Sequence, residues 1–258
     1  MDGGTRVTAM AAEIAPSYRP DLASLAVRYA HLSGQALLRV FLGPPQPARV
    51  ALVSSFGTEA ALLLALVAEI DPTVPVIFID TGKLFGETLR YRDDLIARLG
   101  LRDVRTIMPD PARLAAVDPS GTLWLGDPDA CCFVRKVEPL ARALAGFDIW
   151  ISGRKRYQTT LRATLPTLEI LDGRLKLNPL ALWSREAIEA EVARRGLPPH
   201  PLEAEGFLSI GCMPCTGRVK DGEDRRAGRW RGSDKTECGI HWPVDAGAPC
   251  ASVEGTDV

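Results

Sequence analysis

The sequence predicts an α/β protein, a single domain with a mostly parallel, twisted sheet flanked by helices. Short apolar runs typical of buried strands alternate with longer segments whose apolar residues recur at helical spacing. Gly, Pro and Asp residues separate these segments. The chain has 258 residues, 46% of them hydrophobic, which is enough for one sizeable core. Because strands that alternate with helices form βαβ units, we expect parallel strands.

The first half predicts a leading helix and then three strands joined by two helices. The leading helix covers Leu22 to Leu42 and ends at Gly43-Pro44-Pro45, because proline cannot continue it. We expect strands over residues 49–54, 74–80 and 104–108, and helices over 58–70 and about 85–99.

In the second half strands and helices alternate less regularly. A helix is predicted over 131–144, a strand over 147–152, a hairpin over 168–177 and a helix over 184–195. Residues 216–234 are rich in glycine and charge, which predicts a mobile segment. We therefore divide the chain into an N-terminal helical segment (1–45), an α/β nucleotide-binding core (46–211) and a mobile C-terminal catalytic segment (212–258).

Charge and hydropathy argue against several classes of partner. The formal net charge of -1 provides no overall field that would attract nucleic acid or an anionic membrane. The first residues show no basic stretch followed by an apolar one, and no window approaches 18 uninterrupted apolar residues. We expect a cytoplasmic protein that binds neither nucleic acid nor membrane.

Four of the six cysteines form two tight clusters, Cys131-Cys132 and Cys212-x-x-Cys215. A single cysteine is most often a small buried hydrophobe, but two clusters together point to metal. In a cytosolic protein, four thiolates can close a tetrahedral sulfur site for zinc or iron–sulfur. Adjacent ligands are unusual in structural zinc sites, so the Cys131-Cys132 pair favours a 4Fe-4S cluster.

A fifth cysteine, Cys238, lies apart from both clusters. Lys235 precedes it and His241 follows it three residues later. Because cationic neighbours stabilise a thiolate, this position is typical of a nucleophile.

Residues suited to anions follow the predicted strands, at the edge where open parallel sheets bind ligands. Hydroxyls and amides at a helix N-terminus can cradle a phosphate, although the same turn could simply cap the helix. A basic loop follows the strand over 147–152, and we favour anion binding there over a solvated face. These residues are Ser54, Ser55, Phe56 and Gly57 after the first strand, Asp80, Thr81 and Gly82 after the second, and Gly153, Arg154, Lys155, Arg156 and Arg162 in the basic loop.

Together the motifs resemble the assimilatory adenylyl-sulfate reductases. The resemblance covers about Ser54 to His241 in consistent order. It is carried by Ile79-Asp80-Thr81-Gly82-Lys83-Leu84-Phe85, Cys131-Cys132-x-x-Arg135-Lys136, Ser152-Gly153-Arg154-Lys155, Cys212-x-x-Cys215-Thr216, Gly228-Arg229-Trp230 and Lys235-Thr236-Glu237-Cys238-Gly239-Ile240-His241.

The resemblance implies an adenine nucleotide alpha hydrolase-like fold and a reaction of sulfate assimilation, which leads to cysteine biosynthesis. In that reaction adenosine 5′-phosphosulfate passes its sulfonate to a cysteine, and thioredoxin or a similar dithiol then releases sulfite. The paired cysteines resemble the iron–sulfur branch of the family, which uses this nucleotide.

The resemblance also implies roles for individual residues. It makes Cys238 the nucleophile and Cys131, Cys132, Cys212 and Cys215 the ligands of the 4Fe-4S cluster. It implies further catalytic residues at Lys136, Arg226, Arg229 and His241. The implied substrate-binding set is Ser54, Ser55, Phe56, Gly57, Asp80, Thr81, Gly82, Leu84, Gly153, Arg154 and Arg162.

Other interpretations stay open from the sequence. One is a reductase of the 3′-phosphorylated nucleotide, or an enzyme that accepts both substrates. A second is an ATP-using pyrophosphatase or sulfur-transfer enzyme of similar architecture, although the usual Gly-Gly-Lys-Asp motif is missing. A third is a zinc-stabilised nucleotide- or nucleic-acid-binding protein. A homo-oligomer is compatible with each of them.

Overall fold

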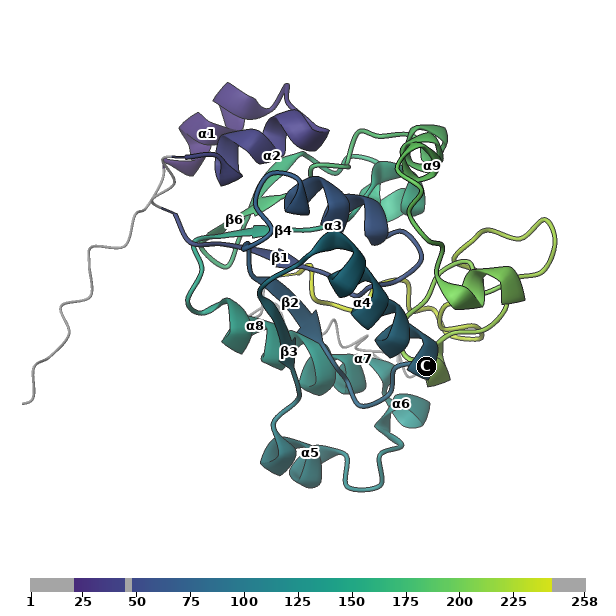
Figure 1. Ribbon diagram of the computed structural model, residues 1–258. Coiled ribbons are helices and arrows are strands. Elements are labelled where there is room, and N and C mark those ends of the chain that lie inside the picture. Colours follow the sequence, from purple (N-terminus) through teal and green to yellow (C-terminus); the bar gives the residue numbers. More distant parts are fainter. Residues whose placement is uncertain (1–20, 45–47, 243–258) are drawn as a thin grey trace, which may run out of the picture.

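A computed structural model describes residues 21–44 and 48–242 of the chain. It contains one six-stranded sheet whose spatial order is β3-β2-β1-β4-β6-β5. All neighbouring strands are parallel except the β5–β6 hairpin. The α/β architecture expected from the sequence is therefore confirmed (Figure 1). The strands are β1 Val50–Val53, β2 Val76–Ile79, β3 Val104–Ile107, β4 Ile149–Ile151, β5 Leu168–Leu171 and β6 Arg174–Leu177.

The order in which successive strands are added to the sheet reverses between β1 and β4. Strands β2 and β3 extend it on one side of β1, and β4, β6 and β5 extend it on the other. Leu52 of β1 lies opposite Val76 on one side and Ile151 on the other. Ligands of open α/β sheets bind at such a switch point, outside the carboxyl ends of the strands.

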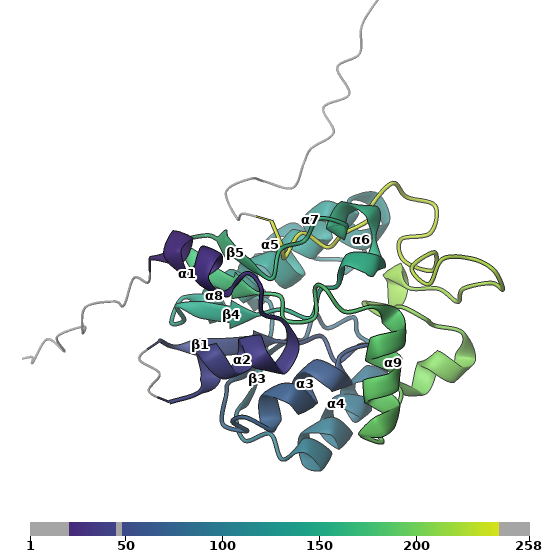
Figure 2. The same ribbon diagram turned by 90° about the horizontal axis from the view of Figure 1, so that it is seen from above.

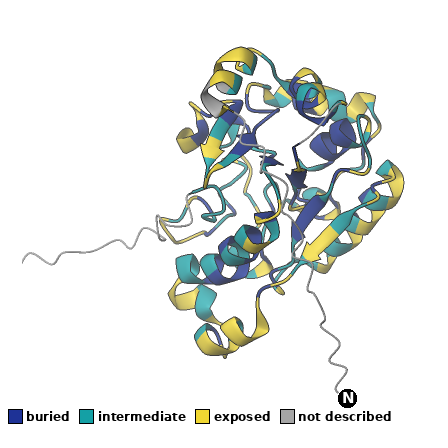
Figure 3. Cartoon of the chain, turned by 90° about the vertical axis from the view of Figure 1, so that its left-hand side faces the viewer, coloured by how far each residue is buried: buried dark blue, intermediate teal, exposed yellow. Residues whose placement is uncertain are grey.

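Helices cover both faces of the sheet (Figure 2). Residues of α2 Gly34–Leu42, α3 Ala61–Ala68, α4 Gly86–Leu99 and α9 Arg185–Arg194 pack in the larger core. Every residue from Ala61 to Val67 is buried, so α3 has almost no solvated face. Figure 3 shows buried residues in the middle of the molecule and exposed residues on the outer faces of the helices. On the opposite face, Leu140 and Leu144 of α8 Glu138–Leu144 pack with Ala51, Ile77 and Trp150.

The expected leading helix is in fact two helices, α1 Leu22–Tyr29 and α2. The break covers residues 30–33, and Gly34, the first residue of α2, has a left-handed φ of 53°. A Cβ at this position would lie 2.6 Å from the Trp183 ring, so a tertiary contact sets the break. Residues 1–20 and 45–47 lie outside the described part of the chain.

The expected helix over 131–144 begins earlier and is not uniform. It runs as α7 Pro128–Cys132, a π-helical turn Phe133–Val137 and α8. Two short helices precede α7, α5 Pro111–Val117 and α6 Leu123–Gly126, and the periodicity of the sequence did not indicate them. Such π-turns are frequent at functional sites, and this one carries Lys136.

The hairpin and α9 match their predictions. Beyond residue 206 the described chain has one short 3₁₀ turn, Met213–Cys215, and otherwise irregular backbone. The mobility of this segment and the three-part division of the chain stay predictions. Among the described residues, no helix is both long and apolar enough to cross a membrane.

Candidate active site

A cavity opens at the switch point, between the turns that follow β1 and β4. Ser54, Ser55 and Gly57 line it from the β1 side, and Gly153 and Arg154 line it from the β4 side. The sequence-predicted anion turn and basic loop are thus brought together.

Phe56 anchors the turn after β1. Its side chain is completely buried and packs edge to face on Phe78, with 5.5 Å between ring centroids. Its φ of 48° is unusual for a residue with a side chain, and the Ser54 Oγ accepts its backbone N–H at 3.2 Å. The buried Phe56 ring therefore helps to fix the conformation of this turn.

The walls of the cavity carry buried polar atoms that have no hydrogen-bond partner among the described residues. Since buried polar groups are normally satisfied, these atoms are available to a polar ligand. They are Ser152 Oγ, Arg154 Nε, Arg229 Nε and His241 Nδ1.

The basic loop is largely neutralised by acids that lie far away in sequence. Arg154 pairs with Glu169, and the Lys155 Nζ lies 3.0 Å from a carboxylate oxygen of Glu59. Burial lowers the pKa of Lys155 and opposes the effect of Glu59. The sequence did not indicate Glu59 as a site residue, although it lies two residues after the anion turn Ser54–Gly57. The loop is therefore not a free cluster of cations.

The two cysteine clusters meet beside this cavity. Cys131 and Cys132 are buried at the end of α7, and Cys212 is buried at the start of the 3₁₀ turn. Burial is the main cause that raises the pKa of Cys131, and the nearby Cys212 and Cys215 raise it further. Burial also raises the pKa of Cys132 to about 12.

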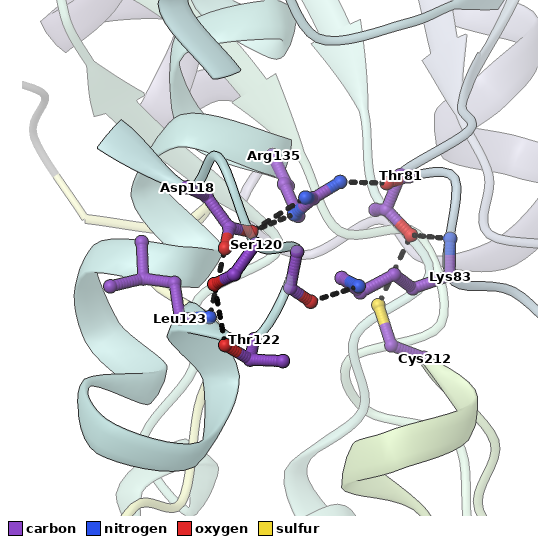
Figure 4. Close-up of polar contacts among 9 residues, drawn as sticks. Thr81, Lys83, Asp118, Ser120, Thr122, Leu123, Arg135 and Cys212 are labelled. Carbon is purple, nitrogen blue, oxygen red and sulfur yellow. Dashed lines mark hydrogen bonds and ion pairs between the residues drawn. The ribbon is translucent and has the colours of Figure 1, made fainter. Parts of the chain in front are cut away.

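Thr81, which follows β2, contacts both Cys212 and Arg135 (Figure 4). Its Oγ1 lies 3.2 Å from the Cys212 Sγ and accepts the backbone N–H of Lys83. Because the hydroxyl oxygen is already an acceptor, its hydrogen is free to point at the sulfur. Lys136 and this contact lower the pKa of Cys212 against the effect of burial, which favours a thiolate there.

Behind Thr81 lies a buried ion pair between Arg135 and Asp118. The Arg135 guanidinium donates to Asp118 Oδ2 at 2.6 and 3.2 Å and to the Thr81 carbonyl at 2.8 Å. Asp118 also accepts the backbone N–H of Leu123 at 2.9 Å (Figure 4). The sequence did not indicate Asp118, because nothing near it in the chain marks it as a partner of Arg135.

The cysteines of the two segments lie close enough to influence one another's pKa. Four thiols converge from two segments, and the Trp230 backbone N–H bonds to the Cys215 carbonyl at 3.0 Å. The buried Trp230 indole N–H has no partner among the described residues, and Trp230 lines the cavity. Within that part of the chain, no three His, Cys, Asp or Glu side chains form a group that could hold a metal ion.

Lys136 connects the thiols to the cavity. It lines the cavity, and although burial opposes its charge, Cys212, Cys132 and Cys238 raise its pKa. These neighbours favour the charged form of Lys136, which lies near both the predicted ligands and the predicted nucleophile.

The C-terminal segment returns to the same cavity. Cys238 and His241 both line it, and Ile240 packs with the apolar cluster around Trp150. The His241 ring stacks on Trp150 with 5.9 Å between centroids and 8° between planes. Burial lowers the pKa of His241, and Lys176 and Arg154 lower it further, so the ring is neutral near pH 7. Cys250 lies outside the described residues.

Two predicted arginines reach the cavity from the irregular segment. Arg226 donates to the Thr236 carbonyl at 3.0 Å, and the Arg229 guanidinium stacks over the Trp230 ring at 4.3 Å. A Cβ on Gly211 would lie 2.3 Å from Arg229 Nη2, so this glycine leaves room for the arginine. Sequence inspection did not find Gly211.

The remaining predicted substrate residues divide into two groups. Thr81 and Leu84 line the cavity. Asp80 and Gly82 are not among its lining residues, and Asp80 Oδ1 accepts the backbone N–H of Gly82 at 2.9 Å, which caps the turn. Arg162 lines the cavity but is bonded to Glu237.

Comparison with known proteins shows the family to which this chain is similar. Residues 49–218 match the family model described as the phosphoadenosine phosphosulfate reductase domain. A protein of Mesorhizobium japonicum named adenosine 5′-phosphosulfate reductase is 54% identical over 192 residues, 74% of this chain and 76% of that protein.

Two further relatives extend the comparison. A Chelativorans protein of the same name is 46% identical over 220 residues, 85% of this chain and 90% of that protein. A crystal structure described as phosphoadenylyl-sulfate (PAPS) reductase from Candida auris, in a phosphate complex, is 25% identical with a TM-score of 0.64. The match covers 77% of this chain and 96% of that one.

Proposed function

Because the chain belongs to the phosphoadenosine phosphosulfate reductase family, we propose that it reduces adenosine 5′-phosphosulfate to sulfite and AMP in sulfate assimilation. It is an oxidoreductase that acts on sulfur. The observation that carries the proposal is the location of Cys238, which lines the same cavity as the anion turn Ser54–Gly57 and the cation Lys136.

The first step is transfer of a sulfonate. The Cys238 thiolate attacks the sulfate sulfur, a bond forms between Sγ and that sulfur, and the bond from sulfur to the phosphate oxygen breaks. AMP leaves with the electron pair, and Cys238 becomes an S-sulfocysteine. Lys136, Arg226 and Arg229 offset the negative charge of nucleophile and leaving group. Since His241 is neutral, it contributes a hydrogen bond rather than a charge.

The second step needs two electrons from a dithiol such as thioredoxin. One of its thiolates attacks the Cys238 Sγ, sulfite leaves, and a mixed disulfide forms. The second thiol then displaces Cys238, which returns as a thiol while the reductant becomes a disulfide. We place this reaction in the cytoplasm, where such reductants keep thiols reduced.

The cysteines Cys131, Cys132, Cys212 and Cys215 would hold a 4Fe-4S cluster. The unpartnered indole N–H of Trp230, the Thr81 hydroxyl and Lys136 fit sulfur acceptors at that position. When bound, the cluster would supply a local negative charge and a fixed link between the two cysteine segments.

The unphosphorylated nucleotide is the preferred substrate in this proposal. A 3′-phosphate would need a cation of its own, but Arg154, Lys155 and Arg162 are each paired with an acid. The Candida auris neighbour, which is named for the 3′-phosphorylated substrate, favours the alternative that this chain reduces that nucleotide. Comparison of kcat/KM for the two nucleotides separates the alternatives.

Trapping the intermediate tests the reaction itself. Without reductant, the enzyme should gain about 80 Da, one sulfonate, on Cys238 and stop after one turnover. Cys238→Ser should keep the fold and nucleotide affinity but release no sulfite. A sulfonate on Cys250, or wild-type sulfite release by Cys238→Ser, would show that the nucleophile is another group.

A further inference from the structure

We propose that Glu237 is a positioning residue whose ion pair with Arg162 holds the neighbouring Cys238 in place at the cavity. The inference rests on the function proposed above, because it concerns the nucleophile of that reaction. The sequence indicates no role for Glu237, and the family resemblance implies that Arg162 binds substrate.

The ion pair is bidentate and buried. Arg162 Nε donates to Glu237 Oε1 at 2.7 Å, and Arg162 Nη2 donates to Oε2 at 2.6 Å. Each side chain is only 9% exposed. Two parallel hydrogen bonds fix orientation as well as distance, so this contact restrains the backbone at Glu237 more than an exposed ion pair would.

Each of the three guanidinium nitrogens of Arg162 donates a hydrogen bond to the protein. Its third nitrogen, Nη1, donates to Gln158 Oε1. These bonds use three of the five N–H donors of the guanidinium, so two remain for a substrate. Because two of the three bonds go to Glu237, the position of Arg162 fits anchoring of the C-terminal segment.

Glu237 has few other ways to compensate its buried charge. Arg226 Nη2 lies 3.8 Å from Oε2 and is already bonded to the Thr236 carbonyl. Loss of Arg162 would leave the carboxylate buried without its main partner, which favours movement of the segment toward water.

Cys238 lies between anchors on both sides. Upstream, Lys235 pairs with Asp129 of α7, and downstream Ile240 packs against the cluster around Trp150. The Glu237 pair is the anchor directly adjacent to the nucleophile and lies in the cavity wall. Release of this pair should expose Cys238 without unfolding the sheet.

The test measures access to Cys238 in the absence of substrate. The full-length protein is treated with iodoacetamide, and modification of the Cys238 peptide is followed by mass spectrometry at a pH on the rate plateau, where thiolate fraction no longer matters. Glu237→Gln should react at least tenfold faster than wild type. Glu223→Gln, which removes an exposed ion pair with Arg231 in the same segment, should react at the wild-type rate.

A double-mutant cycle identifies the partner. Arg162→Met should accelerate modification as much as Glu237→Gln, and the double variant should be no faster than either single variant, because all three remove one contact. Additive effects would overturn the proposal, as would an unchanged rate in Glu237→Gln.

A kinetic split separates positioning from ligand binding. In Glu237→Gln, single-turnover formation of the S-sulfocysteine should slow at least tenfold, while the Kd for AMP stays within twofold of wild type. Tighter AMP binding with unchanged Cys238 modification would mean that the carboxylate blocks a ligand subsite, and positioning would be wrong. The modification rate involves no turnover, so it stays informative even if the proposed reaction fails.

Discussion

Gly211 illustrates how one missing side chain positions a functional group. A Cβ there would overlap Arg229 Nη2 at 2.3 Å, and the overlapped atom is the free end of a flexible side chain. The arginine would therefore move and the backbone would not.

We expect Gly211→Ala to lower kcat on the order of tenfold, a loss equivalent to about 1.4 kcal/mol of transition-state stabilisation, with a small change in Tm. Steady-state kinetics and thermal unfolding measure the two effects. Gly126→Ala is the matched control, because no atom lies within 4 Å of a Cβ at that position. Equal activity of both variants would show that Arg229 does not depend on Gly211.

His200 gives the fold a dependence on pH. It is 1% exposed, its Nδ1 accepts the backbone N–H of Leu202 at 3.2 Å, and its Nε2 lies 3.1 Å from Thr88 Oγ1. Because Nδ1 is an acceptor, Nε2 carries the proton of the neutral ring. Burial lowers the pKa of His200 to about 4.

The sign of the effect follows from linkage. The unfolded state takes up a proton near the usual histidine pKa, whereas the folded state resists until about pH 4. This contribution to stability is complete above about pH 6.5 and declines as the pH falls toward 4, by at most about 3 kcal/mol.

His200→Asn keeps an acceptor for the backbone of Leu202 but does not titrate. We expect it to be less stable than wild type at pH 7, with a difference that shrinks between pH 6.5 and 4.5. Urea unfolding at several pH values provides the free energies. If the free energies of unfolding of wild type and His200→Asn changed in parallel with pH, His200 would not be the group responsible.

At the scale of elements, the Asp118–Arg135 pair fixes the π-helical turn against the end of β2. Arg135 of this pair donates to the Thr81 carbonyl, and the Thr81 hydroxyl contacts Cys212 (Figure 4). The ion pair therefore helps to align the segment that carries Cys131 and Cys132 with the segment that carries Cys212. The two side chains are 1% and 8% exposed.

Asp118→Asn should destabilise the iron-free protein by about 3–5 kcal/mol, because it leaves Arg135 buried without an opposite charge. The double variant Asp118→Leu, Arg135→Met should recover much of this stability. It should nevertheless lose iron to a chelator on the order of tenfold faster than wild type, since alignment of the cysteines is not restored.

The exposed pair between Arg113 and Glu138 supplies the control. Glu138→Gln should change neither the free energy of urea unfolding nor the rate of iron release by much. If the double variant released iron at the wild-type rate, the buried pair would contribute to stability and would not align the cysteines.

At the scale of the whole molecule, the predicted cluster joins segments that are far apart in sequence. Cys132 ends α7, and Cys212 lies beyond β4, the hairpin and α9. A group bound by both segments stabilises the folded state, because the unfolded chain cannot hold it in the same way.

Anaerobic removal of iron should therefore lower the Tm by several degrees, measured by circular dichroism. Cys212→Ser, purified the same way, should melt with the iron-free wild type and should not respond to the chelator. A wild-type Tm that does not change when the iron is removed would argue against a structural link through these cysteines.

The sequence predicted the features that depend on local pattern. Apolar runs such as Val50–Val53 and Val76–Ile79 indicated the strands, and their alternation with helices indicated a parallel sheet. The family motifs identified the family of the chain, which the comparisons confirm. The roles proposed for Cys238 and the four clustered cysteines stay predictions.

Tertiary structure decided which charges meet. Arg162 and Glu237 are 75 positions apart, Lys155 and Glu59 are 96 apart, and Arg135 and Asp118 are 17 apart. No local periodicity relates such residues, because chain crossovers bring them together. For the same reason the sequence determined which groups could act as cations and nucleophile, while the fold decided which cations are already paired and which remain available to a substrate.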